Sequence, residues 1–199
     1  MEKGMDKKVL LLLAQGFEAY EASVFTDVFG WSQVVGDVSL GVVTAARRPV
    51  IQCKWNFRVL PEIRVSEVDV TEYDALAIPG GFKRAGFYED AYNEDFLNLI
   101  RQFHESKKPI AAVCSAALAL GKSGILKGKK ATTYHLMNEI LRKELKGYGV
   151  DVQDAHIVVD DRIFTSTSPA TALEVAFKLL EMLTTRKHCR RVKEAMGFR

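Results

Sequence analysis

The chain has 199 residues, of which 48% are apolar and 27% are charged, and its formal net charge is +3. This length and composition predict one globular domain over residues 1–199, with residues 1–7 as an N-terminal extension and residues 186–199 as a basic tail. Six of the 28 basic side chains stand in that tail, so the rest of the chain lacks the wide basic face of a nucleic-acid-binding protein.

Short apolar runs alternate with helical segments along the chain, which predicts a mostly parallel sheet covered by helices on both faces. The apolar runs predict strands at residues 8–13, 38–44, 74–78, 109–113 and 130–133. Apolar spacing and capping residues predict helices at residues 19–35, 93–106, 115–120, 136–145 and 168–184. Two hairpins are expected, one at residues 50–60 around Trp55-Asn56 and one at residues 156–165. The basic tail is expected to be a solvated helix end or a subunit contact.

The loop after the first predicted strand supplies two carboxylates, Glu18 and Glu21. Glu18 suits the first turn of the following helix, where an acidic side chain interacts favourably with the helix dipole. Glu21 is expected on the buried side of that turn, where desolvation raises a carboxyl pKa and keeps the group protonated. A protonated carboxyl can donate a hydrogen bond to a thiolate and later act as an acid or base. The alternative is an exposed helix glutamate.

Two later loops complete a candidate site. Gly80 and Gly81 allow unusual backbone dihedral angles and a close approach to a ligand, although a Pro-Gly-Gly turn alone indicates no function. The strand at residues 109–113 ends at Cys114, and the small residues after it are typical of a nucleophile elbow. A thiol at a helix N-terminus is expected to have a lowered pKa, whereas the alternative is a buried structural cysteine. If the three loops meet at one edge of the sheet, the N–H groups of Gly81 and Ser115 form an oxyanion hole.

The three cysteines, Cys53, Cys114 and Cys189, lie far apart and form no CxxC pair, so neither a disulfide framework nor a zinc site is indicated. An odd cysteine count without a signal sequence fits the reducing cytoplasm. The longest uncharged run, residues 109–121, is shorter than the ~20 residues of a membrane span. We therefore expect a soluble cytoplasmic protein that uses no metal or cofactor and has no membrane or nucleic-acid partner.

Five short motifs follow one another along the chain: AQGFEAYE at 14–21, IPGG at 78–81, AAVCS at 111–115, TTYH at 132–135 and TSTSP at 165–169. In this order they resemble the ThiJ/PfpI superfamily and, within it, the protein deglycase branch. The resemblance covers residues 8–183 and implies a flavodoxin-like, three-layer αβα sandwich that forms a homodimer. It also implies that Cys114 is the nucleophile and Glu21 its acid/base partner, with Gly81 and Ser115 as backbone donors.

The chain departs from that family pattern at several positions. Ser115 stands where protease-like members carry a histidine, so the base of a Cys-His hydrolase is missing. Deglycases carry a histidine after the Thr-Thr pair, where this chain has Tyr134, with His135 one position later; either side chain is a candidate for the site. Thr167 stands where close relatives carry a basic residue. These departures leave the substrate open.

The resulting hypothesis is a cofactor-independent cysteine enzyme of the glyoxalase or deglycase type. Its expected partner is a small reactive carbonyl or a glycated adduct. The residues assigned to catalysis or binding are Cys114, Glu21, His135, Tyr134, Gly80, Gly81, Ser115 and Glu18. One alternative is a redox sensor or stress-protective chaperone that acts through oxidation of Cys114. A peptidase or amidotransferase-like hydrolase is a further alternative that Ser115 disfavours, and a catalytically silent binding module is the last.

Overall fold

The computed structural model describes residues 7–36 and 38–198, and these form a three-layer α/β/α sandwich around a seven-stranded sheet, as the sequence predicts. The strand order is β10-β11-β7-β6-β1-β2-β5, and every neighbouring pair is parallel except β10 and β11. The strands of this sheet are β1 (Lys7–Leu13), β2 (Leu40–Ala46), β5 (Ile63–Arg64), β6 (Ala75–Ile78), β7 (Ile110–Ala112), β10 (Ile157–Asp160) and β11 (Ile163–Ser166).

Two further pairs of short strands lie outside the main sheet. An antiparallel hairpin is formed by β3 (Ile51–Gln52) and β4 (Arg58–Val59), and a parallel pair by β8 (Lys130–Ala131) and β9 (Asp151–Val152). The β3–β4 hairpin confirms the turn predicted around Trp55-Asn56, and the antiparallel β10–β11 pair confirms the second predicted hairpin.

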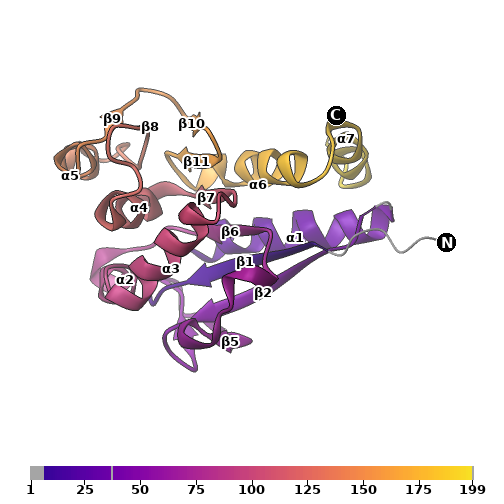
Figure 1. The fold of residues 1–199 in the computed structure, drawn as a ribbon, viewed down its shortest axis with the longest axis horizontal. Coiled ribbons are helices and arrows are strands. Elements are labelled where there is room, and N and C mark those ends of the chain that lie inside the picture. The colour runs from indigo at the N-terminus through magenta and orange to yellow at the C-terminus, as the bar shows by residue number, and fades with distance from the viewer. Residues whose placement is uncertain (1–6, 37, 199) are drawn as a thin grey trace.

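Helices cover both faces of the main sheet (Figure 1). One layer contains α1 (Ala19–Val35), α6 (Pro169–Leu183) and α7 (Arg186–Ala195), which pack on one another. The other layer contains α2 (Phe87–Ala91), α3 (Glu94–Glu105), α4 (Ala117–Ser123) and α5 (Ile140–Gly147). Among the described residues, no helix is both long and apolar enough to cross a lipid bilayer.

The apolar run of β1 explains why the sheet is buried on both faces. Leu10 and Leu12 pack into the core beneath α3 and α4, whereas Leu11 and Leu13 pack into the core beneath α1 and α6. This alternation follows from the two-residue period of a strand, which sends successive side chains to opposite faces. The unbroken apolar run of residues 9–13 therefore joins two cores.

The sheet places β1 next to β6, and the chains leaving these two strands turn to opposite layers. After β1 the chain enters α1, and after β6 it continues to α2 and α3. Ligand sites of open α/β sheets form at such a reversal, outside the carboxyl ends of the strands. The loops that follow β1 and β6 are joined at this point by a backbone hydrogen bond, in which the Glu18 N–H donates to Gly80 O at 2.8 Å.

Several boundaries differ from the predicted ones. The second strand is Leu40–Ala46 instead of 38–44, and β8 ends at Ala131, so residues 132–133 belong to a loop. The helix predicted from residue 136 begins at Ile140, because residues 136–139 form bends and turns beside a cavity. Helix α2 was not predicted, since five residues are too few to show a helical period.

The two ends of the chain also differ from the predicted extension and tail. Lys7 already belongs to β1, and the other residues of the predicted N-terminal extension lie outside the described residues. In the basic tail, α7 buries Cys189 and Val192 against α1 and α6, so only part of this segment is solvated. Four of its cationic side chains are exposed, as in an amphipathic helix, whereas Lys193 is half-buried with its Nζ 4.8 Å from the Phe177 ring centroid.

Candidate active site

Cys114 lies at a sharp turn between β7 and α4. Its backbone has φ of 57°, in the left-handed region that non-glycine residues adopt only where the surrounding structure enforces it. Residues Cys114–Ala116 form one 3-10 turn, and α4 begins at Ala117. Ser115 and Ala116 are buried, which explains why only small side chains fit. This strand–turn–helix geometry is that of a nucleophile elbow.

Glu21 projects from the first turn of α1 and is fully buried. Its Oε2 accepts a hydrogen bond of 2.6 Å from the Gly80 N–H. Burial raises the pKa of Glu21 to about 8, although the Gly80 N–H and the Cys114 thiol partly offset this effect. The second oxygen, Oε1, makes no hydrogen bond to the described residues, but the carboxyl is close enough to Cys114 for each group to shift the other's pKa.

The Cys114 thiol does not have the lowered pKa that the sequence led us to expect. Burial raises its pKa well above the usual value, and the negative charge of Glu21 raises it further, whereas the Ser115 N–H lowers it. Burial dominates because the regular helix begins three residues after the sulfur, so the helix end acts on it only weakly. At neutral pH both groups therefore retain their protons, and they lose them as a coupled pair.

Gly80 is a position that only glycine can occupy without displacing its neighbours. A Cβ there would lie 2.8 Å from Val113 O, 2.9 Å from Glu21 Oε2 and 2.9 Å from Ser115 N. The loop after β6 therefore packs directly on both the acid and the elbow. This close approach fixes the Gly80 N–H against the carboxyl of Glu21.

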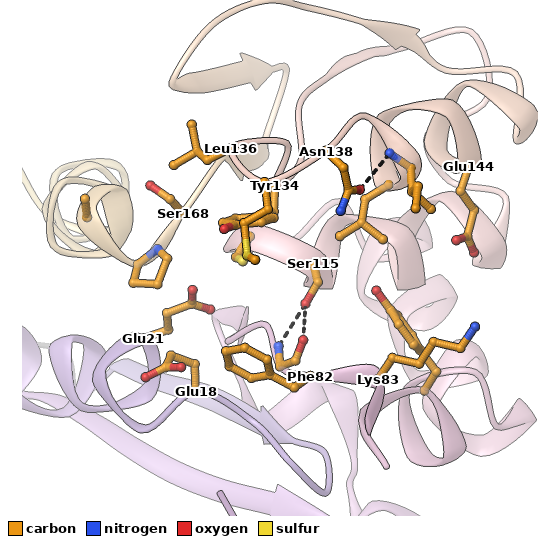
Figure 2. A pocket seen from close by; sticks show the side chains of 18 of the residues that line it. Glu18, Glu21, Phe82, Lys83, Ser115, Tyr134, Leu136, Asn138, Glu144 and Ser168 are labelled. Atoms are coloured by element: carbon orange, nitrogen blue, oxygen red, sulfur yellow. Dashed lines mark hydrogen bonds between the residues drawn. The ribbon is translucent and has the colours of Figure 1, made fainter. Parts of the chain in front are cut away.

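Gly81 and Ser115 hold each other by two hydrogen bonds, drawn as dashed lines in Figure 2. The Gly81 N–H donates to Ser115 Oγ at 2.8 Å, and Ser115 Oγ–H donates to Gly81 O at 2.8 Å. The Gly81 N–H, expected to be an oxyanion donor, is therefore already occupied by the neighbouring hydroxyl. The Ser115 N–H points at the Cys114 sulfur.

Glu18 precedes α1 but makes no side-chain bond to the helix end. Its two carboxylate oxygens instead accept from the Trp55 indole Nε1 at 3.0 and 3.1 Å. Trp55 comes from the turn of the β3–β4 hairpin, and its ring packs edge-on against Phe82 with centroids 5.6 Å apart. Sequence reasoning missed Trp55 because no local pattern indicates that this hairpin reaches Glu18.

Of the two candidates after the Thr-Thr pair, Tyr134 reaches the site and His135 does not line the cavity. The Thr133 hydroxyl donates to Cys114 O at 2.9 Å, which ties this loop to the elbow. The His135 ring nitrogen Nδ1 lies 3.2 Å from Thr133 O. Burial and the proximity of Cys114 raise the pKa of Tyr134, so its hydroxyl stays protonated at neutral pH.

These groups open onto a cavity of about 800 Å³ (Figure 2). Glu21 and Glu18 lie at one end, and Glu144 lies on the other side of Ser115. Ser168 and Pro169, from the TSTSP motif, also line the cavity. Lining residues that the sequence did not indicate are Phe82, Lys83, Tyr88, Tyr92, Leu136, Met137, Asn138, Ile140, Leu141, Glu144 and Ala170. Most come from α2 and the residue that ends it, from the segment leading into α5, and from α5 itself, all of which approach the elbow only in the folded chain. Over the described residues, no three His, Cys, Asp or Glu side chains are grouped to hold a metal ion.

A sequence model of the DJ-1/PfpI family matches residues 7–182. Among curated proteins, the chain is 28% identical to DJ-1beta of Drosophila melanogaster, with 96% of this chain and 97% of the relative covered. It is 31% identical to a deglycase of Thermococcus kodakarensis, with 81% and 90% covered. It is 32% identical to a Bacillus subtilis protein named Putative cysteine protease YraA, with 83% and 91% covered.

Solved structures agree with this sequence similarity. The crystal structure of Drosophila melanogaster DJ-1beta superposes with a TM-score of 0.82 at 25% identity, covering 98% of this chain and 100% of that one. A ThiJ/PfpI family protein from Pseudomonas syringae superposes with a TM-score of 0.83 at 19% identity and covers 98% of this chain and 76% of that one. The second likeness concerns the fold alone.

Proposed function

The chain belongs to the DJ-1/PfpI family, and on this basis we propose that it is a cofactor-independent cysteine enzyme that converts α-oxoaldehydes, or their adducts, into 2-hydroxy acids. The observation that carries the proposal is the buried Glu21 carboxyl beside the Cys114 thiol, at one end of a cavity of about 800 Å³. A relative named a deglycase supports the same class of substrate.

The reaction begins when one proton has left the Cys114–Glu21 pair. As the sulfur attacks the aldehyde carbon, the thiol proton passes to the Glu21 carboxylate. The Glu21 carboxyl then gives this proton to the aldehyde oxygen, which forms the hemithioacetal and restores the carboxylate. Glu21 is suited to accept this proton because burial raises its pKa to about 8, close to working pH.

Two further steps complete the conversion. The Glu21 carboxylate removes the proton from the former aldehyde carbon, which gives an enediol, and returns a proton to the adjacent carbon. The hydroxyl proton of the former aldehyde carbon passes to the neighbouring oxygen, and the product is a thioester of the 2-hydroxy acid. Water then cleaves the thioester and releases the acid and the Cys114 thiol. The sum is the addition of one water to the oxoaldehyde, so the oxidation at one carbon is balanced by the reduction at its neighbour.

The developing negative charge on the substrate oxygen requires hydrogen-bond donors. The Ser115 Oγ–H and the Gly81 N–H lie together at the elbow. In this structure the hydroxyl donates to Gly81 O, and the Gly81 N–H donates to Ser115 Oγ. Rotation of the Ser115 hydroxyl toward a bound substrate would release both donors. The phenol of Tyr134, which stays protonated, is a third donor lining the same cavity.

The direct test is turnover of methylglyoxal by the purified protein without glutathione. We expect lactate to form, and we expect Cys114→Ser to abolish its formation. Cys189→Ser is the matched control, because it removes a buried thiol that does not line the cavity. Absence of lactate above the buffer rate from the wild-type protein would refute the proposal.

Two alternative uses of the thiol have less support. Peptidase chemistry needs a base such as imidazole, and no histidine is among the described residues that line the cavity. Selective oxidation of a sensor cysteine is favoured by a low pKa, whereas the pKa of Cys114 is raised. The family resemblance also predicts a homodimer, and light scattering of the purified protein would test this prediction.

A further inference from the structure

The end of the cavity away from Glu21 has a chemistry that the proposed reaction does not use. We call it the tyrosine–glutamate end and define it by Tyr88, Tyr92 and Glu144, all of which line the cavity. Figure 2 shows the Glu144 carboxylate separated from Glu21 by the region around Ser115. This end therefore lies where the remote part of a substrate held on Cys114 would extend.

The Glu144 carboxylate is held in place by two phenols. Tyr92 Oη donates to Glu144 Oε1 at 2.7 Å, and Tyr148 Oη donates to the same oxygen at 3.1 Å. Oε2 receives no hydrogen bond from any residue that the structure describes. A carboxylate with one oxygen fixed and the other free is prepared to accept from a charged donor.

Two tyrosine rings line the cavity together with this carboxylate. The rings of Tyr88 and Tyr92 have centroids 4.6 Å apart and planes tilted by 36°. The Lys122 Nζ, which does not line the cavity, already lies 5.1 Å from the centroid of the Tyr92 ring. Tyrosine rings beside a carboxylate are the combination that proteins use to bind ammonium and guanidinium groups.

The remaining lining residues indicate the kind of spacer that would join such a cation to the reacting carbonyl. Leu136, Met137, Ile140 and Leu141 line the cavity and provide an apolar surface. The volume of about 800 Å³ suits a drug-sized ligand and greatly exceeds a three-carbon oxoaldehyde. Lys83 is the single cationic side chain among the described lining residues, against the carboxylates of Glu18 and Glu144, since Glu21 keeps its proton at neutral pH.

We propose that the tyrosine–glutamate end binds an ammonium or guanidinium group of the substrate. The preferred substrate is then a reactive carbonyl compound joined by an apolar spacer to a cationic group. This inference rests on the proposed function for its reacting carbonyl, but the binding of the cation depends only on the cavity and on the Cys114 thiol.

A covalent probe series tests the cation site without any turnover. Three bromoacetamides carry the same six-carbon spacer and end in trimethylammonium, in its neutral isostere tert-butyl, or in sulfonate. In each, the Cys114 sulfur displaces bromide and forms a carbon–sulfur bond, and rates are read by intact mass relative to 2-mercaptoethanol. We expect the trimethylammonium probe to react at least about fivefold faster than the tert-butyl probe, and the sulfonate probe to be slowest.

Glu144→Gln is the decisive variant, because its amide oxygen still accepts from the two tyrosines while the charge is removed. We expect the trimethylammonium-to-tert-butyl ratio to fall by about fivefold. Glu139→Gln is the matched control, since it removes an equal charge from the same segment outside the cavity, and it should leave the ratio unchanged. An equal ratio in wild type and Glu144→Gln overturns the cation site.

A turnover measurement separates this inference from the proposed function. Phenylglyoxal and a ring-substituted trimethylammonium phenylglyoxal are compared by kcat/KM in both proteins. A preference for the cationic compound that Glu144→Gln abolishes supports both claims. If neither compound is converted while the probe ratio still depends on Glu144, the proposed reaction fails and the cation site stands. Conversion without any charge preference overturns the cation site alone.

Discussion

Ser115 and Gly81 exchange two hydrogen bonds across the candidate active site, each of 2.8 Å. Ser115 thereby holds the loop that follows β6 against the elbow. Its hydroxyl oxygen accepts from the Gly81 N–H, which is the donor that an oxyanion would need. In the protease-like relatives that the sequence resembles, this position holds a histidine. In this protein it holds Ser115, and we call the two hydrogen bonds between Ser115 and Gly81 the latch.

Ser115→Ala tests the structural part of that latch. The change leaves the Gly81 N–H and C=O without their partner at a half-buried position that lines the cavity. The cost there lies toward the lower end of the range of about 1–3 kcal/mol for unpaired buried groups. We expect a loss of that size in the free energy of unfolding, measured by urea denaturation. Ser123→Ala is the control, because it removes one local bond to Leu120 O within α4, and it should cost less. Equal losses in the two variants would contradict the latch.

The pH dependence of stability reports the burial of Glu21. Its carboxyl has a pKa of about 8 in the folded protein, against an ordinary value of 4.5, so the folded state binds more protons between these limits. The contribution of this group to stability is therefore greatest below pH 4.5 and falls as pH rises toward 8, by at most about 1.4 kcal/mol for each step of one in pH. Glu21→Gln should flatten this slope. A wild-type slope that persists unchanged in the variant would assign it to other groups.

Glu18 is expected to make a small contribution to the pH range of activity, because its charge adds to the effect of burial that raises the pKa of both Glu21 and Cys114. In the wild-type protein, kcat/KM should rise with pH through about 8, where the pair loses its first proton. Glu18→Gln keeps an oxygen for Trp55 but removes the charge, so the midpoint should move to lower pH. Glu174→Gln, on α6 outside the cavity, should leave it in place, and a change of equal size there would rule out a local effect.

Gly80→Ala tests the close contact between the loop and the acid. A Cβ placed 2.8–2.9 Å from Val113 O, Glu21 Oε2 and Ser115 N must displace at least one of them. We expect a loss of about 1–3 kcal/mol in stability and at least about a tenfold drop in turnover, since the carboxyl moves from the sulfur. Gly30→Ala, where a Cβ meets nothing within 4 Å, should be neutral or slightly stabilising. Unchanged turnover in Gly80→Ala would show that the contact is not needed.

The sequence predicted those parts of the site that depend on local pattern. The buried run of β1, the helical spacing of α1 and the small residues around Cys114 each specify their own conformation, and they bring Glu21 to the elbow. Trp55, Tyr88 and Glu144 were not predicted, because each reaches the cavity through packing between segments distant in the chain. The direction of the Cys114 pKa was also missed, since burial around the sulfur depends on the folded neighbours and outweighs the helix end.

We propose a dual role for Glu21, which restrains the Cys114 thiol and yet performs the proton transfers. It is tested most directly by the pH dependence of Cys114 alkylation in the wild-type protein and Glu21→Gln, with methylglyoxal turnover measured in parallel. We expect alkylation in Glu21→Gln to have its midpoint at lower pH, because the charge that raises the Cys114 pKa is gone, and we expect turnover to be lost. Identical alkylation midpoints, or full turnover without the carboxyl, would contradict it.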